Sequence, residues 1–129
     1  MSGIDRVSTI TIAVKDENEA LRWFTEKLGF EKRLDLAGPG LRWLTVAPRQ
    51  QKEVQFLLAT WFPDHVGKNA TCVVDTEDCR ATYDALKARG VRFKQEPQER
   101  PYGTEAVFQD LYGNTYALVE HATPTGGGP

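Results

Sequence analysis

The sequence predicts an α+β fold made of two successive βαβββ modules, because one pattern of residues occurs twice. Residues 9–14 alternate between apolar and more polar side chains, as in a strand, and residues 16–28 carry apolar side chains at helical spacing. The same order returns from residue 71 onward, with Gly90 in the place of Gly29. The nearly constant offset between the two copies indicates an internal duplication.

Length and composition are those of an ordinary globular domain. The 129 residues are 40% apolar and 26% charged, and no apolar run approaches the roughly 20 residues that span a bilayer. The net charge of −2 comes from acidic and basic residues spread along the chain, which gives no electrostatic footprint for nucleic acid. We therefore expect neither a membrane nor a nucleic-acid partner.

The first residues and the cysteines bear on the cellular compartment. Residues 1–6 lack a basic start followed by an apolar stretch, so no secretory signal is visible and we expect a cytoplasmic protein. Cys72 and Cys79 have the spacing of neither a zinc site nor a CxxC redox pair, which indicates plain thiols.

The first module begins with a strand and a capped helix. Alternate apolar residues give the strand one apolar face that must be buried, and the following helix is predicted to pack on it. Asp16 is predicted to cap that helix, with Glu19 at a spacing like that of a capping box, and Gly29 to end it. Three further strands are predicted at residues 32–36, 41–47 and 53–59.

The second module repeats this order, with Asp78 as the helix cap. Its predicted elements are a strand at 71–74, a helix at about 79–89, a strand at 91–94, and a hairpin of 105–109 with 115–120. Residues 95–103 contain two prolines and are predicted to form a long polar connection. Gly113 and Asn114 suit the hairpin turn, which needs positive φ.

We expect residues 1–121 to form a single domain with modules at about 7–59 and 71–121. Residues 60–70 are predicted to be a linker, in which Trp61 and Phe62 pack under another element or against a partner chain. Residues 122–129 are mainly Thr, Pro and Gly, which predicts a disordered tail without function.

Four segments together resemble a known superfamily, the vicinal oxygen chelate group of glyoxalases, bleomycin-resistance proteins and extradiol dioxygenases. The segments are residues 14–16 (VKD), 23–30 (WFTEKLGF), 78–91 and 108–114 (FQDLYGN). The resemblance covers nearly the whole chain, with one departure at Leu111, where proline is usual. It implies that each module curls a mixed sheet into a cup, with helices outside, and that the protein is a homodimer.

The resemblance also implies where a metal would bind. Members that hold a metal place one ligand on the first and one on the last strand of each module, and these positions fall on Thr9, Gln55, Thr71 and Ala117. None is His or Glu, whereas a catalytic divalent ion generally needs about three nitrogen, sulfur or carboxylate donors. We therefore expect no metal and no cofactor. Only a one-residue slip of register would bring the carboxylate of Glu120 or Asp75 to a metal-ligand position, and such a slip turns a side chain to the opposite face.

Without a metal, recognition must rest on shape, aromatic surface and a few hydrogen bonds. Strand alternation directs Thr9, Thr11, Gln55, Thr71 and Ala117 into the cup, and a core filled by these residues is the alternative. Arg42 and Trp43 together would stack a planar ligand and hold a carboxylate, although Trp43 also suits an ordinary core.

Arg100 and Tyr102 lie beside a proline and a glycine, where they form either a mobile lid over a ligand or a structural turn.

The leading hypothesis is a protein that binds and sequesters a small, partly planar organic molecule in the cup. Two alternatives stay open: a divalent-metal-dependent lyase, isomerase or dioxygenase with relocated ligands, and a structural or regulatory dimer with a filled cup. His65 and His121 are the side chains that titrate near neutrality, and alternation places neither in the cup, so the catalytic residues are unknown.

Overall fold

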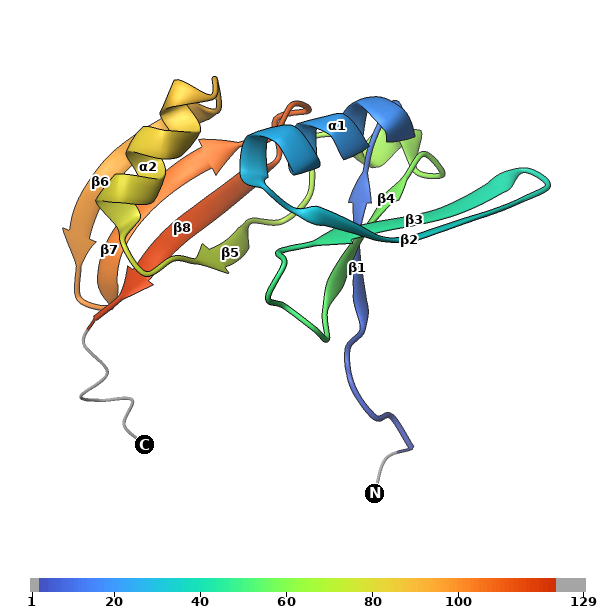
Figure 1. The fold of residues 1–129 in the computed structure, drawn as a ribbon, viewed down its shortest axis with the longest axis horizontal. Helices are drawn as coiled ribbons and strands as arrows, with labels where there is room; N and C mark the ends of the chain where they lie inside the picture. The colour runs from blue at the N-terminus through green and yellow to red at the C-terminus, as the bar shows by residue number, and fades with distance from the viewer. Residues whose placement is uncertain (1–2, 123–129) are drawn as a thin grey trace. The chain divides into compact units, whose positions relative to one another are not determined.

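The computed structural model describes residues 3–122 and confirms the tandem βαβββ order. The chain divides into two compact units, Met1–Gly67 and Lys68–Pro129, which are described separately below. Each unit contains one α-helix on one face of a four-stranded mixed sheet (Figure 1).

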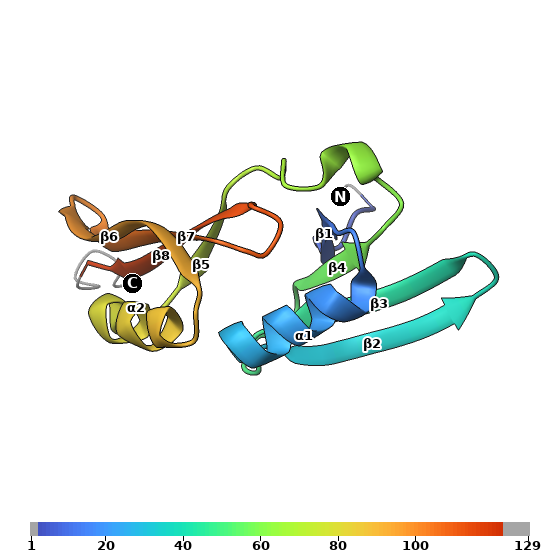
Figure 2. The ribbon, with the colours of Figure 1, turned by 90° about the horizontal axis from the view of Figure 1, so that it is seen from above.

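The first unit builds its sheet in the order β1-β4-β3-β2, with β1 parallel to β4 and the other pairs antiparallel. Its elements are β1 (Thr9–Ala13), α1 (Glu17–Leu28), β2 (Glu31–Gly38), β3 (Leu41–Ala47), β4 (Gln55–Ala59) and the short 3-10 helix η1 (Pro63–His65). The predicted strand at 41–47 is confirmed, and β2 is longer than predicted. The β2–β3 hairpin extends beyond the N-terminal end of α1 (Figures 1 and 2).

Helix α1 has the predicted caps and closes the core of the first unit. Asp16 Oδ1 accepts the Glu19 N–H at 2.9 Å, and Gly29 follows the helix with φ of 74°. Phe24 is fully buried, with its ring centroid 5.7 Å from that of Phe30 and 6.2 Å from that of Phe56. Burying a phenylalanine side chain of this kind contributes about 2–3 kcal/mol. The other buried residues between the helix and the sheet are Ala20 of α1 together with Ile12, Val14, Leu44, Val46 and Leu58.

The second unit has the equivalent sheet order, β5-β8-β7-β6. Its elements are β5 (Cys72–Asp75), α2 (Cys79–Ala88), β6 (Arg92–Arg100), β7 (Gly103–Gln109) and β8 (Thr115–His121). Asp78 Oδ1 accepts the Ala81 N–H at 3.0 Å, which confirms the predicted cap of α2. The core between α2 and its sheet consists of Cys79 and Leu86 of the helix together with Val91, Ala106, Phe108, Tyr116 and Leu118.

The prediction of a long polar connection at residues 95–103 is wrong. Strand β6 continues through this segment to Arg100, which pairs with Gly103 across a tight turn. Proline was the misleading signal, because it removes a backbone donor from a sheet. Pro97 is tolerated here since β6 is an edge strand and the pairing register shifts between Gln95 and Gln98.

The predicted hairpin of β7 and β8 is confirmed, and a buried carboxylate organises its loop. Asp110 Oδ1 accepts the N–H groups of Tyr112 at 2.9 Å and Asn114 at 3.0 Å. Its Oδ2 accepts the Asn114 Nδ2–H at 2.9 Å and the Tyr116 hydroxyl at 2.7 Å. Gly113 has φ of 92°, as the turn requires. The loop therefore keeps its geometry although Leu111 stands in place of proline.

The end of the chain is described only as far as Ala122, whose N–H donates to the Tyr102 carbonyl at 2.9 Å. The rest of the predicted disordered tail, residues 123–129, lies outside the described residues. Between residues 3 and 122, no helix has the length and apolar character needed to cross a membrane.

Candidate functional site

The candidate site lies on the sheet face of the first unit that points away from α1. This face, called the first-unit face below, is formed by every second residue of three strands, starting from Thr9 in β1, Leu41 in β3 and Gln55 in β4, with Leu34 and Leu36 from β2. Thr9 and Gln55 are half-buried, so part of the face is accessible within the unit.

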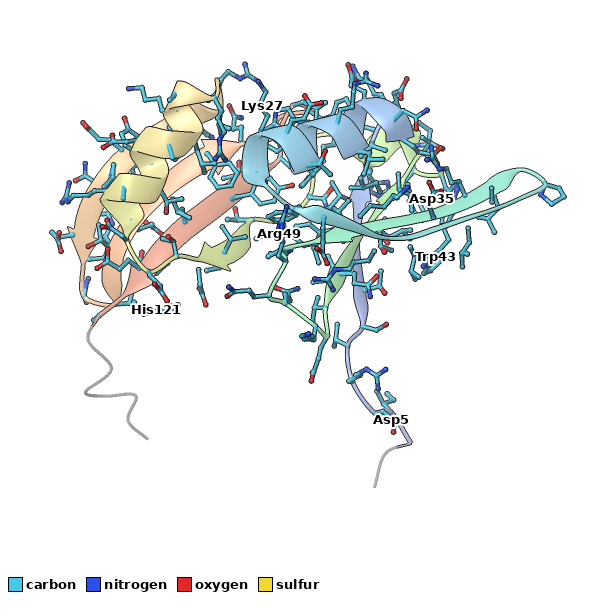
Figure 3. All side chains as sticks on the ribbon, viewed as in Figure 1. Asp5, Lys27, Asp35, Trp43, Arg49 and His121 are labelled. Atoms are coloured by element: carbon cyan, nitrogen blue, oxygen red, sulfur yellow. The ribbon has the colours of Figure 1, made fainter. Side chains whose placement is uncertain are left out.

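Trp43 occupies this face and forms the start of an aromatic cluster. Its ring centroid lies 6.1 Å from that of Trp61, and the Trp61 centroid lies 6.2 Å from that of Phe62. Phe62 in turn meets His65 of η1 edge-on, with centroids 6.0 Å apart. We call Trp43, Trp61, Phe62 and His65 the aromatic cluster. Figure 3 shows Trp43 on the side of the β2–β3 hairpin opposite to Asp35.

The contact between Trp61 and Trp43 is not among the features predicted from the sequence. The available signal was the alternation of β4, which continues past Ala59 through one residue to Trp61. The segment was interpreted as a linker instead. Trp61 and Phe62 remain 36% and 44% exposed, so their rings offer apolar surface in addition to their contacts with each other.

Arg42 does not lie on the same face of the sheet as Trp43. The predicted pair, in which Trp43 stacks on a planar ligand and Arg42 holds its carboxylate, therefore does not form. The Arg42 Nε and Nη2 donate to the two carboxylate oxygens of Asp35, each at 2.9 Å, and Nη1 donates to Asn18 Oδ1 at 2.8 Å. This guanidinium therefore lies on the α1 side of the sheet. It holds the pKa of the Asp35 carboxyl below its ordinary value.

Arg100 and Tyr102 lie at the end of a hairpin in the second unit, which is the geometry of the structural turn, one of the two alternatives predicted for them. Tyr102 is one of the two turn residues between β6 and β7. Arg100 Nη2 donates to Gln95 Oε1 at 3.2 Å, and Arg100 Nε lies 3.5 Å from Glu105 Oε1. The guanidinium is thus engaged within the hairpin, and the Tyr102 side chain is about half exposed.

The four positions transferred from the superfamily pattern are arranged differently in the two units. In the first unit Thr9 lies directly opposite Gln55, at the start of the parallel pair of β1 and β4. In the second unit Ala117 lies opposite Val73, and Thr71 precedes β5. Thr9 and Gln55 therefore form a cross-strand pair, and Thr71 and Ala117 do not.

Strand pairing also shows which residues of the two units correspond. One backbone hydrogen bond closes each parallel pair, from Val14 N–H to the Ala59 carbonyl and from Thr76 N–H to the Val119 carbonyl. By this register Ala117 corresponds to Leu57, and Gln55 corresponds to Thr115. A constant sequence offset would match Gln55 with Ala117, and it fails because the segments leading to β4 and β8 differ in length. Leu57 and Ala117 have no donor atom for a metal.

Glu120 and Asp75, the carboxylates that a one-residue slip of register would bring to the metal positions, have other partners. Glu120 Oε1 accepts the Cys79 N–H at 2.9 Å at the start of α2, and Asp75 Oδ1 lies 2.9 Å from His121 Nε2. Within residues 3–122, no three His, Cys, Asp or Glu side chains gather closely enough to hold a metal ion. The relocated-ligand alternative thus has no set of donors in the described part of the chain.

Comparison with known proteins decides the family. A sequence model of the Glyoxalase/Bleomycin resistance protein/Dioxygenase superfamily matches residues 4–118. The chain belongs to this superfamily. The resemblance found in the sequence is confirmed by this match.

Several known proteins are similar to this chain over nearly its whole length. The crystal structure of UcmS2 is 41% identical, with a TM-score of 0.81, and the match covers 91% of this chain and 98% of UcmS2. TnmS3, an antibiotic binding protein from Streptomyces sp. CB03234, is 29% identical with a TM-score of 0.84, covering 95% of this chain and 100% of TnmS3. The uncharacterized protein YetH of Bacillus subtilis (strain 168) is 33% identical over 123 residues, which are 91% of this chain and 99% of YetH.

Proposed function

We propose that this protein binds a small, partly planar organic molecule on the first-unit face and sequesters it. The observation that carries the proposal is the aromatic cluster, in which Trp43, Trp61 and Phe62 follow one another at 6.1 and 6.2 Å and keep exposed ring surface. The similarity to TnmS3, an antibiotic binding protein, supports the same ligand class.

Tryptophan and phenylalanine rings suit this task for a physical reason. They provide large apolar areas with few rotatable bonds, and a planar ligand gains offset-stacked or edge-to-face contacts worth about 0.5–1.5 kcal/mol beyond area burial. The neighbouring strands add neutral polar groups. Thr9 and Gln55 stand side by side on the first-unit face. The Gln55 backbone N–H donates to the Ser8 carbonyl at 2.9 Å, and no group among residues 3–122 hydrogen-bonds to the Gln55 side-chain amide. That amide is available as both donor and acceptor for a ligand.

The groups on this face are suited to binding rather than to bond breaking. Threonine, glutamine, tryptophan and phenylalanine side chains orient a ligand through hydrogen bonds and stacking, and none of these four residue types titrates near neutral pH. Sequestration needs only affinity and shape. Thr71, Arg100, Tyr102 and Ala117 lie in the second unit, and their role in binding stays a prediction from the sequence.

We further propose a cytoplasmic homodimer. Phe62, which lies beyond Trp61 in the aromatic cluster and is 44% exposed, supports an interface with a second copy beside the ligand. The free thiols of Cys72 and Cys79 support a reducing compartment. Light scattering coupled to size-exclusion chromatography measures the mass of the particle, and a monomer at micromolar concentration would contradict the dimer.

Equilibrium binding to a panel of planar antibiotics and other polycyclic compounds tests the function. Binding that quenches tryptophan fluorescence, and returns the compound unchanged after denaturation of the protein, is the expected result. Chemical conversion of a bound compound would contradict sequestration, and absence of binding across the panel would contradict the ligand class. The Trp23→Phe variant serves as the fluorescence control, because Trp23 lies on α1 and not on the first-unit face.

A further inference from the structure

The first-unit face carries no ionisable side chain along β1, β3 and β4. Its members on these strands are threonine, glutamine, alanine, leucine and tryptophan. From β2, Leu34, Leu36 and Gly38 join them, and Glu31 stands opposite Ala47 at one end of the strand. On the opposite side of the same sheet, Arg42 and Asp35 form a bidentate ion pair. The charged residues of β3 and the outer part of β2 are thus confined to the α1 side.

The nearest charged groups at the margin of the face are already neutralised or exposed. Arg33 Nε lies 2.8 Å from Glu31 Oε2, and Arg33 Nη2 donates to the Pro48 carbonyl at 2.7 Å. This pair marks one end of β2. Asp64 and His65 of η1 are exposed, where water and salt screen their charges.

The absence of charge is a property of this face and does not follow from the fold. By the register of the two units, Ala13, Trp43 and Trp61 in the first correspond to Asp75, Glu105 and His121 in the second. The duplicated scaffold therefore accepts ionisable side chains at each of these positions. The first unit has aromatic or small apolar side chains there instead.

We infer that the part of the ligand held on the first-unit face is an uncharged planar ring system, and that the face selects against ionised relatives of the same ring. The inference rests on the proposed function and specifies its ligand class. An ion placed on this face loses its hydration and finds no counter-charge, whereas a neutral ring loses little hydration free energy. Hydrogen bonds from Thr9 and Gln55 then serve neutral substituents such as carbonyl, hydroxyl or amide groups.

One ring system in three charge states provides the test. Naphthalene-2-carboxamide, naphthalene-2-carboxylate and 2-(aminomethyl)naphthalene are close in size and are neutral, anionic and cationic at pH 7. In equilibrium dialysis against the full chain, we expect the carboxamide to bind at least about tenfold more tightly than either ion. Its affinity should change little between about 0.05 and 0.5 M salt.

The outcomes separate this inference from the proposed function. An ion that binds more tightly than the carboxamide, or affinity that falls steeply with salt, overturns the selection for neutral rings and leaves the binding function standing. If none of the three compounds binds and the antibiotic panel also fails, both are overturned.

Charge placed on the face supplies a second test. Leu36 lies opposite Trp43 across the β2–β3 pair and is 61% exposed, so its substitution should not disturb folding, which circular dichroism checks. We expect Leu36→Lys to shift selectivity several-fold toward the carboxylate and Leu36→Glu to shift it several-fold toward the ammonium. The Leu36→Gln variant adds polarity without charge and should keep the preference for the carboxamide. Unshifted selectivity in folded Lys and Glu variants would show that the ring binds elsewhere.

Discussion

The indole of Trp61, two residues beyond the end of β4, lies 6.1 Å from the indole of Trp43 in the middle of β3, with the rings tilted by 40°. This contact joins the segment after β4 to the sheet face opposite α1. It places two large aromatic rings side by side without burying either completely. A planar ligand therefore meets a surface formed before it binds, which reduces the cost of ordering side chains.

The first prediction concerns the energy that this surface contributes to binding. Trp43→Ala should lower ligand affinity by about 1–3 kcal/mol, because a central aromatic anchor of this kind usually dominates binding. Isothermal titration calorimetry with a ligand from the panel measures the loss. Trp23→Ala on α1 is the matched control and should leave affinity near the wild-type value. An unchanged affinity in a folded Trp43→Ala protein would make Trp43 a core residue only.

The second prediction concerns the turn between β6 and β7. Gly103 has φ of 141°, and a Cβ there would lie 2.8 Å from Ala122 N and 2.9 Å from His121 Cα, with the Glu120 carbonyl oxygen closer still. Gly103→Ala should therefore reduce the free energy of unfolding by about 3 kcal/mol or more. Gly38→Ala, in the β2–β3 hairpin, meets nothing within 4 Å and should change it by less than about 0.5 kcal/mol. Urea denaturation compares the two, and equal effects would refute the steric account.

The third prediction concerns alkaline stability. Burial, followed by the nearby charge of Asp110 and the hydrogen bond to it, raises the pKa of Tyr116. A raised folded-state pKa means that this phenol stabilises the fold below its ordinary pKa of about 10, and that the contribution is lost as pH rises above it. The free energy of unfolding should therefore fall less steeply between pH 9 and 11 in Tyr116→Phe than in the wild type.

At neutral pH the same variant should be about 1–2 kcal/mol less stable, because Asp110 loses one donor. Tyr83→Phe removes the phenol hydroxyl from α2 and is the control. Urea midpoints across the pH range provide the measurement, and identical alkaline slopes for wild type and Tyr116→Phe would contradict the prediction.

The fourth prediction concerns acid. The hydrogen bonds from Arg42 lower the pKa of Asp35, so the pair stabilises the fold above the ordinary Asp pKa of about 4. This contribution disappears as pH falls through the lowered value. The stability difference between wild type and Asp35→Asn should therefore be present at pH 6 and should shrink below about pH 4.

Urea midpoints between pH 2.5 and 7 measure this difference. Asp5→Asn, in the exposed segment before β1, is the control. A difference that stays constant through the acid range would show that the Arg42–Asp35 pair does not contribute through its charge.

Local rules recovered most elements of the fold because short-range chemistry determines them. Asp16 and Asp78 cap their helices through the expected N–H groups, and the Asp110 loop forms the expected hairpin. Residues 95–103 were misjudged because the cost of a proline depends on whether a strand lies at a sheet edge, and β6 does. Edge position is a property of the assembled sheet and cannot be read from neighbouring residues.

The candidate site was predicted less completely than the fold. Alternation correctly directed Trp43 away from the helix, and the same alternation, followed strictly, separates it from Arg42. Arg42 was grouped with Trp43 because they are adjacent in sequence, and in a strand adjacent side chains point to opposite faces. The contact of Trp61 with Trp43 depends on the pairing of β3 with β4, which the local pattern of residues does not specify.

The sequence alone determined the duplication, the helix caps, the alternation of the strands and the absence of His or Glu at the four positions where a metal would be expected. Each of these depends on residue type and spacing over one or two turns. The tertiary structure decided which residues of the two units correspond and which aromatic rings meet. It also showed that Arg42 binds Asp35 across the β2–β3 pair and that Glu120 binds the backbone at the start of α2. Contacts between distant segments depend on register and loop length, which local pattern does not specify.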